Sequence, residues 1–563
     1  MFEEKIKEKI KFYALENAIK FDGKANPKNL IGKIIADFPE VKKNMKNLMI
    51  EIEQIVNKIN NLTIDDQEKE IKTFNFEKKT PQKEKTLKEL QDVDKRDVVM
   101  RFEPSPSGPL HIGHAYTLSL NMAYVEKYNG KMILRISDTN PENIDPKAYD
   151  LIKEDADWIL NKNYEFYIQS NRMDSYYKYA KILIEKNKAY VCTCSQEDFK
   201  NCLDNKTDCP CRNIKVEEQL IRWDKMLNEY EQGTAILRFK TDMQHKNPAM
   251  RDFGLMRINE FEHPLQKNKY RVWPLMNFSV SIDDMETNIS HTLRGKDHAD
   301  NAKKQALIHE VLNYDTPNAI NVGRINFKGF PVSCSKTKAL ILEGKYENWE
   351  DVRIPFLRAL RRRGYLPETL KQFAVDVGVT QTDKTVNIDE YFKTINSINK
   401  SLLDANAKRY FFIKDAKEIV IKNAPKLKLN LKLHPEKDLG NRNFITDESF
   451  LITNDDYENI IKSNDNDLFR LMDCLNFTKI NDEFVFHSLE YEKFKDNGKF
   501  IIHWLPKKEK TQCKILMPDN NLIEGYCEDN IKDLNEKETI QFERVGFCKL
   551  ENKKDMKFVY THK

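Results

Sequence analysis

The sequence predicts a multidomain protein in which an α/β domain with a parallel sheet is joined to a helical N-terminal domain and a β-rich C-terminal third. Its 563 residues exceed what one hydrophobic core serves. Apolar residues recur at helical spacing near the N-terminus, strand and helix patterns alternate in the middle, and short strands separated by Asn, Asp and Gly fill the last third. These patterns together predict the fold class.

The first two segments are predicted to be a helical domain and a spacer. Residues 1–62 place apolar residues one helical turn apart, as in NLIGKIIADFPEVKKNMKNLMIEIEQIVNKINNL. Residues 63–96 are dense in charge and poor in large apolar residues, which is typical of a linker or a solvated helix. We expect no chemistry from this second segment.

The α/β domain is predicted in two halves, residues 97–170 and 273–326. In the first half the strand DVVMRFEPS leads through a Pro/Gly turn into a helix, and the strand KMILRISDT precedes another helix. The second half, which contains NISHTLRGKDHADNAKKQALIHEVLNY, again gives a strand and then a helix. Alternating β and α elements imply a parallel sheet, and strand, loop, helix is the order found at nucleotide-binding sites.

Three further blocks complete the predicted organisation. Residues 171–272 include TAILRFKTDM and MRDFGLMRI, which predict strands of an antiparallel insertion that splits the α/β domain. Residues 327–403 are predicted to be helical, and residues 404–563 contain short alternating strands such as FVFHSLEY and KFIIHWLP. The C-terminal block therefore predicts one or two β-barrels or sandwiches.

Composition narrows the class of protein. No run approaches the roughly 18 apolar residues of a membrane span, and the N-terminal stretch MFEEKIKEKIKFYALENAIK carries charges of both signs, unlike a secretory signal. We therefore expect a cytoplasmic protein with no membrane partner. The 93 basic residues nearly balance the 89 acidic ones, so any nucleic-acid surface must come from local patches.

The stretch MRFEPSPSGPLHIGHAYTLSLN carries the strongest chemical signal. Gly108 and Gly113 allow the backbone to approach a ligand, and His111 and His114 stand near the start of the following helix. Unpaired N–H groups and the positive dipole end make a helix N-terminus a phosphate site, and imidazole donors beside it can stabilise charge that develops on a phosphate. The alternative is that both histidines only cap and pack the start of this helix.

Two motifs add a family resemblance. His111-Ile112-Gly113-His114 resembles the HIGH signature of class I aminoacyl-tRNA synthetases. Further on, PVSCSKTK resembles their KMSKS loop, because Ser335 and Lys336 match its serine and second lysine, while Cys334 stands at the methionine position. The two motifs occur in the order that the class requires.

The resemblance is closer to the glutamyl- and glutaminyl-tRNA synthetases, and it extends from about residue 98 to the end. The segments that carry it, in family order, are RFEPSPSGPLHIGHAYT, LRISDTNP, MRDFGLMRI, VWPLMNFSVSIDD, SHTLRGKDH, LRALRRRGY and VGVTQTDKTVNIDEY. It implies a Rossmann-type catalytic domain, an acceptor-binding insertion, a helical connecting domain and two anticodon-binding β-barrels. Those barrels are typical of the archaeal and eukaryotic branch, and the N-terminal helices are similar to an extension of archaeal members.

The choice between glutamate and glutamine depends on cations, because a side-chain carboxylate needs one and its amide isostere does not. The resemblance places Arg101 and Arg294 where glutamyl enzymes hold the γ-carboxylate, whereas glutaminyl enzymes lack the second arginine. Ser105 also matches the glutamyl type, since glutaminyl enzymes carry an acidic residue there. These residues predict glutamate.

Two positions depart from the family pattern. An acidic residue that usually meets the substrate α-ammonium is replaced by Ser137, and Asp138 follows it, so Asp138 is a candidate and the amino-group partner stays open. Met276 replaces a tyrosine common near the substrate in relatives.

The resemblance implies ATP-dependent activation of glutamate, followed by transfer to the terminal adenosine of the glutamate tRNA. His111, His114 and the backbone of Gly113 would cradle the triphosphate, and Lys336 with Ser335 on a mobile loop would close over the pyrophosphate. Such chemistry needs positioning and charge stabilisation rather than covalent catalysis.

Further expectations follow from the same resemblance. Mg²⁺ would accompany ATP, and Asp297 would contact the ribose, unless it caps the following helix instead. The arginines of LRALRRRGY would meet tRNA phosphates. We expect tRNA to be needed before activation and the protein to be a monomer, while charging of the glutamine tRNA stays open.

A cysteine cluster predicts a structural zinc site. In YVCTCSQEDFKNCLDNKTDCPCRN two C-x-C pairs, Cys192 with Cys194 and Cys209 with Cys211, offer four thiolates for tetrahedral Zn²⁺. Cys202 is a possible substitute ligand, and four free thiols are the alternative.

Three other functions compete with a glutamyl-tRNA synthetase. A glutaminyl-tRNA synthetase is the nearest. An adenylyltransferase that uses the HIGH fold on a small metabolite would not need the β-rich tail. An inactive tRNA-binding paralogue is disfavoured by intact His111, His114 and Lys336.

Overall fold

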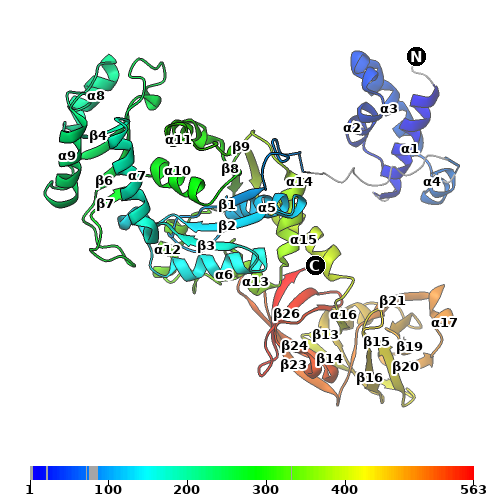
Figure 1. The fold of residues 1–563 in the computed structure, drawn as a ribbon. Coiled ribbons are helices and arrows are strands. Elements are labelled where there is room, and N and C mark those ends of the chain that lie inside the picture. The colour runs from blue at the N-terminus through cyan, green and yellow to red at the C-terminus, as the bar shows by residue number, and fades with distance from the viewer. Residues whose placement is uncertain (1–3, 21–22, 72, 75–86, 331) are drawn as a thin grey trace. The chain divides into compact units, whose positions relative to one another are not determined.

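The computed structural model describes residues 4–20, 23–71, 73–74, 87–330 and 332–563 (Figure 1). The chain forms two compact units, residues 1–84 and 85–563, and each is described by itself. Among the described helices, none combines the length and hydrophobicity that crossing a bilayer requires.

The N-terminal unit is a small bundle of helices, as the helical spacing predicts. Its apolar core includes Ile10, Ala14, Leu48 and Ile52, which one face of each helix contributes. The last helix lies within the segment predicted as a linker or a solvated helix. The helices are α1 Glu4–Lys20, α2 Lys28–Asp37, α3 Met45–Ile59 and α4 Ile64–Ile71.

A parallel sheet forms the centre of the second unit and confirms the α/β prediction. Strands β1 (Val99–Phe102), β2 (Lys131–Ile136) and β3 (Glu165–Ile168) pair in parallel, as do β8 (His291–Gly295) and β9 (Asn318–Val322). The Ser290 N–H donates to Val99 O over 3.0 Å, so β8 lies beside β1 and the order is β3-β2-β1-β8-β9.

Helices connect these strands and supply the rest of the core. They are α5 Ile112–Lys127, α6 Ala148–Leu160, α10 Met276–Glu286 and α11 Ala299–Val311. Strands β1 and β2 are buried along most of their length, which explains their mainly apolar sequences. Gly130 is required where the chain enters β2, because a Cβ there would lie 2.2 Å from Val98 O.

The insertion between the two halves is antiparallel, as predicted. Its sheet has the order β4-β5-β6-β7 and its own core around Leu237 and Trp273. The strands are β4 Ala189–Cys192, β5 Ile236–Phe239, β6 Phe253–Ile258 and β7 Val272–Pro274. The helices are α7 Met173–Glu185, α8 Gln196–Asn205 and α9 Val216–Asn228.

The block from residue 325 to 403 is mainly helical and contacts the start of α5. The Leu357 N–H donates to Leu110 O over 3.0 Å, and the Ile112 N–H donates to Pro355 O over 3.2 Å. Its helices are α12 Cys334–Leu342, α13 Leu357–Arg363, α14 Pro367–Val377 and α15 Ile388–Leu403, and its parallel strands are β10 Ile325–Lys328 and β11 Lys384–Asn387.

The C-terminal third is built on two seven-stranded sheets, which confirms its β-rich character. Their orders are β12-β25-β26-β27-β23-β24-β13 and β21-β18-β19-β20-β14-β17-β22, and β15 and β16 form a separate hairpin. The elements of this third begin with β12 Arg409–Tyr410, β13 Phe412–Lys414, β14 Ala416–Lys422, β15 Lys428–Lys432, β16 Asn441–Ile445, β17 Ser449–Thr453, α16 Asn454–Ile461, β18 Leu468–Leu471 and β19 Asn476–Ile480. They continue with β20 Glu483–Ser488, α17 Tyr491–Lys495, β21 Gly498–Ile502, β22 Leu505–Pro506, β23 Lys510–Leu516, β24 Leu522–Glu528, β25 Thr539–Phe542, β26 Gly546–Asn552 and β27 Lys557–His562.

Candidate active site

A cavity of about 330 Å³ opens where β1, β2 and β8 end. Ligands of parallel α/β sheets bind at this edge, outside the carboxyl ends of the strands. The polar residues of its lining include Arg101, Glu103, Ser105, Ser137, Arg294 and Gln305. The sequence predicts three of these six, namely Arg101, Ser105 and Arg294, and the fold brings them together.

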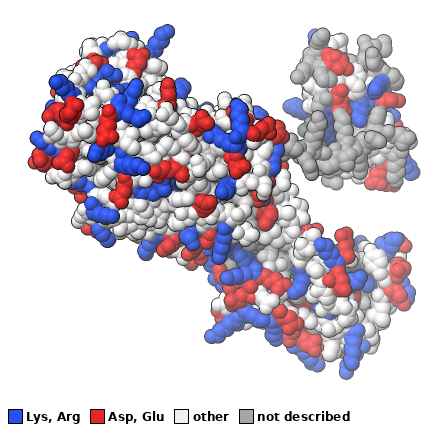
Figure 2. Space-filling view, viewed as in Figure 1, with Lys and Arg blue, Asp and Glu red and all other residues white. Residues whose placement is uncertain are grey.

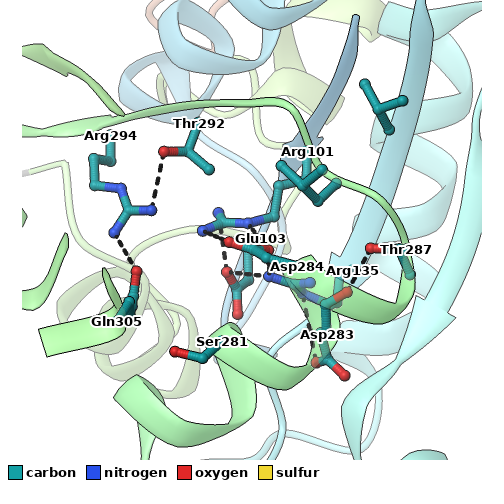
Figure 3. A network of polar contacts seen from close by, with 12 residues as sticks. Arg101, Glu103, Arg135, Ser281, Asp283, Asp284, Thr287, Thr292, Arg294 and Gln305 are labelled. Atoms are coloured by element: carbon teal, nitrogen blue, oxygen red, sulfur yellow. Dashed lines mark hydrogen bonds and ion pairs between the residues drawn. The ribbon is translucent and has the colours of Figure 1, made fainter. Parts of the chain in front are cut away.

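Arg101 enters this cavity as part of a compensated ion-pair network (Figure 3). Its Nε donates to Asp284 Oδ1 over 2.7 Å, and its Nη1 lies 3.0 Å from Glu103 Oε2. Arg135, fully buried, contacts the same two carboxylates. Burial alone would raise the pKa of Asp284, but the two guanidinium groups lower it to about 2.

Arg294 has different surroundings from Arg101. Its Nη1 donates to Gln305 Oε1 over 2.8 Å and its Nη2 donates to Thr292 Oγ1 over 3.0 Å, and both acceptors are neutral (Figure 3). Among the described residues, no carboxylate lies within ion-pair distance of Arg294, and its Nε has no hydrogen-bond partner. Burial, with Arg101 nearby, lowers the pKa of Arg294 to about 10. Arg294 therefore presents a charge that an anionic ligand can pair with.

Asp138 does not reach this cavity. Its side chain is buried and accepts hydrogen bonds from the Tyr149 hydroxyl and the Ser170 N–H, both over 2.8 Å, while His263 Nε2 lies 3.3 Å away. Ser137, one residue earlier, lines the cavity instead. The acid at the cavity is Glu103, which sequence reasoning missed although it directly follows β1.

The two histidines meet at the start of α5. His111 is the N-cap residue, and its Nδ1 accepts the Gly113 N–H over 3.1 Å and the His114 N–H over 3.4 Å, while His114 Nδ1 accepts the His111 N–H. Their rings stack with centroids 3.8 Å apart. Burial lowers the pKa of His114 to about 4 and that of His111 well below its usual value. Both rings are therefore neutral at pH 7.

The tautomer of both histidines follows from these hydrogen bonds. A ring nitrogen that accepts a backbone N–H carries no proton, so the proton of each neutral ring lies on Nε2. Each ring is thereby left with one N–H donor. Gly113 permits this arrangement, because a Cβ there would lie 3.0 Å from the Cε1 atom of His111.

From Cys334 onward the KMSKS-like segment is helical rather than a loop. Cys334 begins α12, is buried, and packs against the position of Gly108, with its Sγ 3.5 Å from Pro109 O. Ser335 and Lys336, the next two residues, are exposed. The packing of Cys334 thus places this helix next to the loop that precedes His111.

Asp297 and two arginines of α13 form ion pairs with other residues of the same chain. Asp297 pairs with Arg324, and α11 has no side-chain cap. Arg358 pairs with Glu154 over 2.6 Å, and Arg362 pairs with Glu551 over 2.5 Å. Arg358 and Arg362 therefore join separate parts of the chain. Contact of the α13 arginines with tRNA phosphates stays a prediction. Figure 2 shows basic and acidic side chains interspersed on the face it views.

Four thiols of the insertion converge on one point. The ligand atoms of Cys192, Cys194, Cys209 and Cys211 all lie within 4.8 Å of one another. The Sγ distances from Cys209 are 3.5 Å to Cys192 and 3.3 Å to Cys194. Zinc–sulfur bonds of about 2.3 Å in a tetrahedron separate the sulfurs by about 3.8 Å, so the group has nearly the size that a zinc site needs.

One thiol of the group is more acidic than an ordinary cysteine, and a fifth cysteine of the insertion lies outside the group. Hydrogen bonding from Cys209 lowers the pKa of Cys192 to about 5. Cys202, on α8, is partly exposed and lies outside the group of four.

Comparison with known families gives three matches along the chain. The family of tRNA synthetases class I (E and Q), catalytic domain, matches residues 97–404. Two families of tRNA synthetases class I (E and Q), anti-codon binding domain, match residues 407–492 and 501–551.

Two glutamate–tRNA ligases are similar to this chain over nearly its whole length, and a solved structure is similar over about half of it. A glutamate–tRNA ligase of Methanocaldococcus jannaschii is 40% identical over 566 residues, covering 99% of this chain and 100% of that protein. A glutamate–tRNA ligase of Methanothermobacter thermautotrophicus is 38% identical and covers 98% of each chain. A solved glutamate tRNA ligase from Elizabethkingia meningosepticum covers 55% of this chain and 70% of its own, at 19% identity and a TM-score of 0.41.

Proposed function

This chain belongs to the class I tRNA synthetases of the glutamate and glutamine (E and Q) family, and from that premise we propose how its site performs the reaction. It is a glutamate–tRNA ligase. The substrates are ATP, glutamate and the glutamate tRNA. The observation that favours glutamate over glutamine as the substrate concerns Arg294. Its guanidinium lies at the cavity and donates hydrogen bonds only to neutral acceptors.

Glutamate would bind with its side-chain carboxylate on Arg294. Arginine presents a planar fork that matches a carboxylate geometrically. Arg101 would flank the same ligand, although Asp284 and Glu103 already compensate its charge. Ser105 leaves the cavity without a repelling acid at that point. Glu103 and Ser137 are the candidates at the cavity for the α-ammonium group, although Arg101 and Arg135 already pair with Glu103.

ATP would bind at the start of α5. The helix N-terminus and the Nε2–H groups of His111 and His114 are donors for phosphate oxygens, and each neutral imidazole offers one such donor. The glutamate α-carboxylate attacks the α-phosphate and pyrophosphate leaves, which gives glutamyl-adenylate. A ribose hydroxyl of the terminal adenosine of tRNA then attacks its carbonyl carbon, takes the glutamyl group and displaces AMP. Lys336, exposed beside this helix start, would neutralise the leaving pyrophosphate.

Asp297 and Mg²⁺ complete the proposed nucleotide site. Mg²⁺ would accompany the phosphates of ATP, as in other phosphoryl transfers. Asp297 stays the candidate for the ribose, and breaking its pair with Arg324 would be part of binding.

The tRNA would contact the insertion at its acceptor end and the C-terminal sheets at its anticodon. We propose that these sheets close into two barrels, since Phe411 alone separates β12 and β13, which are the two edge strands of one sheet. The hairpin of β15 and β16 exposes Lys428 and Lys432 for phosphate contacts. Action as a monomer and a cytoplasmic location belong to this proposal, and charging of the glutamine tRNA stays open.

The four thiols Cys192, Cys194, Cys209 and Cys211 would hold a structural Zn²⁺. Their number, their mutual distances and their softness suit zinc, which would cross-link the insertion. Metal analysis of protein purified without chelator tests this, with Cys209→Ser and, as its matched control, Cys202→Ser. We expect one zinc per chain in the wild type and the control and none in Cys209→Ser. Absence of zinc from the wild type contradicts the proposal.

The test of the function is charging of labelled glutamate or glutamine onto transcripts of the glutamate and glutamine tRNAs. ATP–pyrophosphate exchange without tRNA is the control. Glutamate on one tRNA indicates a discriminating enzyme, and glutamate on both a non-discriminating one. Glutamine on its own tRNA would favour the glutaminyl alternative, while exchange without any charging would favour a small-molecule adenylyltransferase.

A further inference from the structure

The two arginines of the cavity differ in what compensates their charge (Figure 3). Arg101 faces the carboxylates of Asp284 and Glu103. Arg294 faces the amide oxygen of Gln305 and the hydroxyl of Thr292. Of these two cations, Arg294 is the one that forms no ion pair with a carboxylate of the described residues.

Gln305 is held in place to serve as this acceptor. It lies on α11 and is 4% exposed. Because Arg294 can only donate, the amide must turn its oxygen toward the guanidinium and its nitrogen away. That nitrogen lies 3.4 Å from Asn277 Oδ1, which favours the same orientation.

A glutamate side chain has nearly the same shape as that of Gln305, so it would fit the same position, but it would add a negative charge beside Arg294. Glutamate at position 305 would pair with Arg294 as Asp284 pairs with Arg101. A side-chain carboxylate of the substrate would then meet an already neutralised cation and a second negative group, and like charges at such distance repel.

We propose that Gln305 is a specificity-determining positioning residue, which aligns Arg294 through a neutral hydrogen bond and so reserves its charge for the side-chain carboxylate of the amino-acid substrate. The proposal rests on the proposed function, because it takes glutamate as the ligand of Arg294. It adds that selectivity for a charged side chain depends on a residue that supplies no charge itself.

The deciding experiment compares Gln305→Glu with the wild type in steady-state charging of the glutamate tRNA. The KM for glutamate and the inhibition constant of glutamine, the neutral isostere, are both measured. We expect the KM for glutamate to rise by about 30-fold or more, as for a charge pair left unmatched. We expect the inhibition constant of glutamine and the KM for ATP to stay within threefold. Gln372→Glu, which adds the same charge at an exposed position of α14, should behave as the wild type.

Two further variants separate charge from shape. Gln305→Met removes the acceptor without adding charge, so it should raise the KM for glutamate less than Gln305→Glu does. Asn277→Asp places a negative charge one hydrogen bond further from Arg294 and should raise that KM by about three- to tenfold, without affecting glutamine. This variant serves also if Gln305→Glu does not fold.

The possible outcomes distinguish this proposal from the proposed function. If the wild type charges glutamate but the charged variants weaken glutamate and glutamine equally, Gln305 has only a structural role and the proposal is wrong. Equal effects of Gln305→Met and Gln305→Glu would also overturn it. If the wild type does not charge glutamate, the proposed function itself has failed.

Discussion

Replacement of Arg294 by glutamine removes the cation that is expected to bind the substrate carboxylate. Arg101 cannot take over, because Asp284 lies 2.7 Å from its Nε and Glu103 lies 3.0 Å from its Nη1. Loss of the cation that pairs with a buried carboxylate costs about 2–5 kcal/mol of binding free energy. We therefore expect kcat/KM for glutamate to fall by about 30-fold to several thousand-fold.

Arg294→Lys is the matched control for this prediction. Lysine retains the charge but not the planar pair of hydrogen bonds to Gln305 and Thr292, so its loss should be smaller than that of Arg294→Gln. The assay is steady-state charging of the glutamate tRNA with glutamate and ATP varied separately. A kcat/KM of Arg294→Gln within threefold of the wild type, with normal folding, would refute the assignment of Arg294.

Three other predictions concern protonation, metal and packing. Charging rates should show no titration of His111 or His114 between pH 6 and 8. The contribution of these two rings should be lost only as the pH approaches about 4, where His114 becomes protonated and its Nδ1 can no longer accept the His111 N–H. A limb near the usual histidine pKa in the pH–rate profile would contradict this. Chelation of the metal should lower the thermal midpoint of the wild type but not of Cys209→Ser, as followed by circular dichroism; equal shifts would argue against zinc at the thiol group. Gly130→Ala should lower the free energy of unfolding in urea by about 1–3 kcal/mol, because the Cβ of the alanine would lie 2.2 Å from Val98 O. An unchanged urea midpoint would contradict this and would show that the start of β2 can shift to make room.

The elements of the fold were predictable where local patterns decide them. The central strands β1 and β2 of the parallel sheet are buried along most of their length, so they appear in the sequence as mainly apolar runs between helices. The antiparallel insertion and the β-rich last third follow in the same way from short strands and turn residues. Packing between distant segments is not encoded locally. The start of α12 lies beside the loop that precedes His111 because Cys334 is buried against Gly108, a contact across more than two hundred residues.

The candidate site was predictable only in part, for a similar reason. Arg101, Ser105 and Arg294 follow from the family resemblance, and the fold brings them to one cavity. Asp138 was placed by sequence adjacency, but successive side chains of an extended chain point to opposite sides, so Ser137 faces the cavity and Asp138 faces the interior.

The partners of the site arginines could not be predicted from spacing. Asp284 meets Arg101 across 183 positions of sequence, and Arg135 joins them from β2. The signal was present in the buried run SVSIDD of α10, because two adjacent acids in an apolar helix require buried cations.

The most direct measurement of the central claim is chemical identification of the amino acid that the protein attaches to tRNA. The protein would be incubated with ATP, all twenty amino acids and a transcript of the glutamate tRNA, and the amino acid released from the recovered tRNA would be identified by mass spectrometry. We expect glutamate to be the one amino acid recovered from the tRNA, and its attachment to require ATP. Glutamine, another amino acid, or none would contradict it.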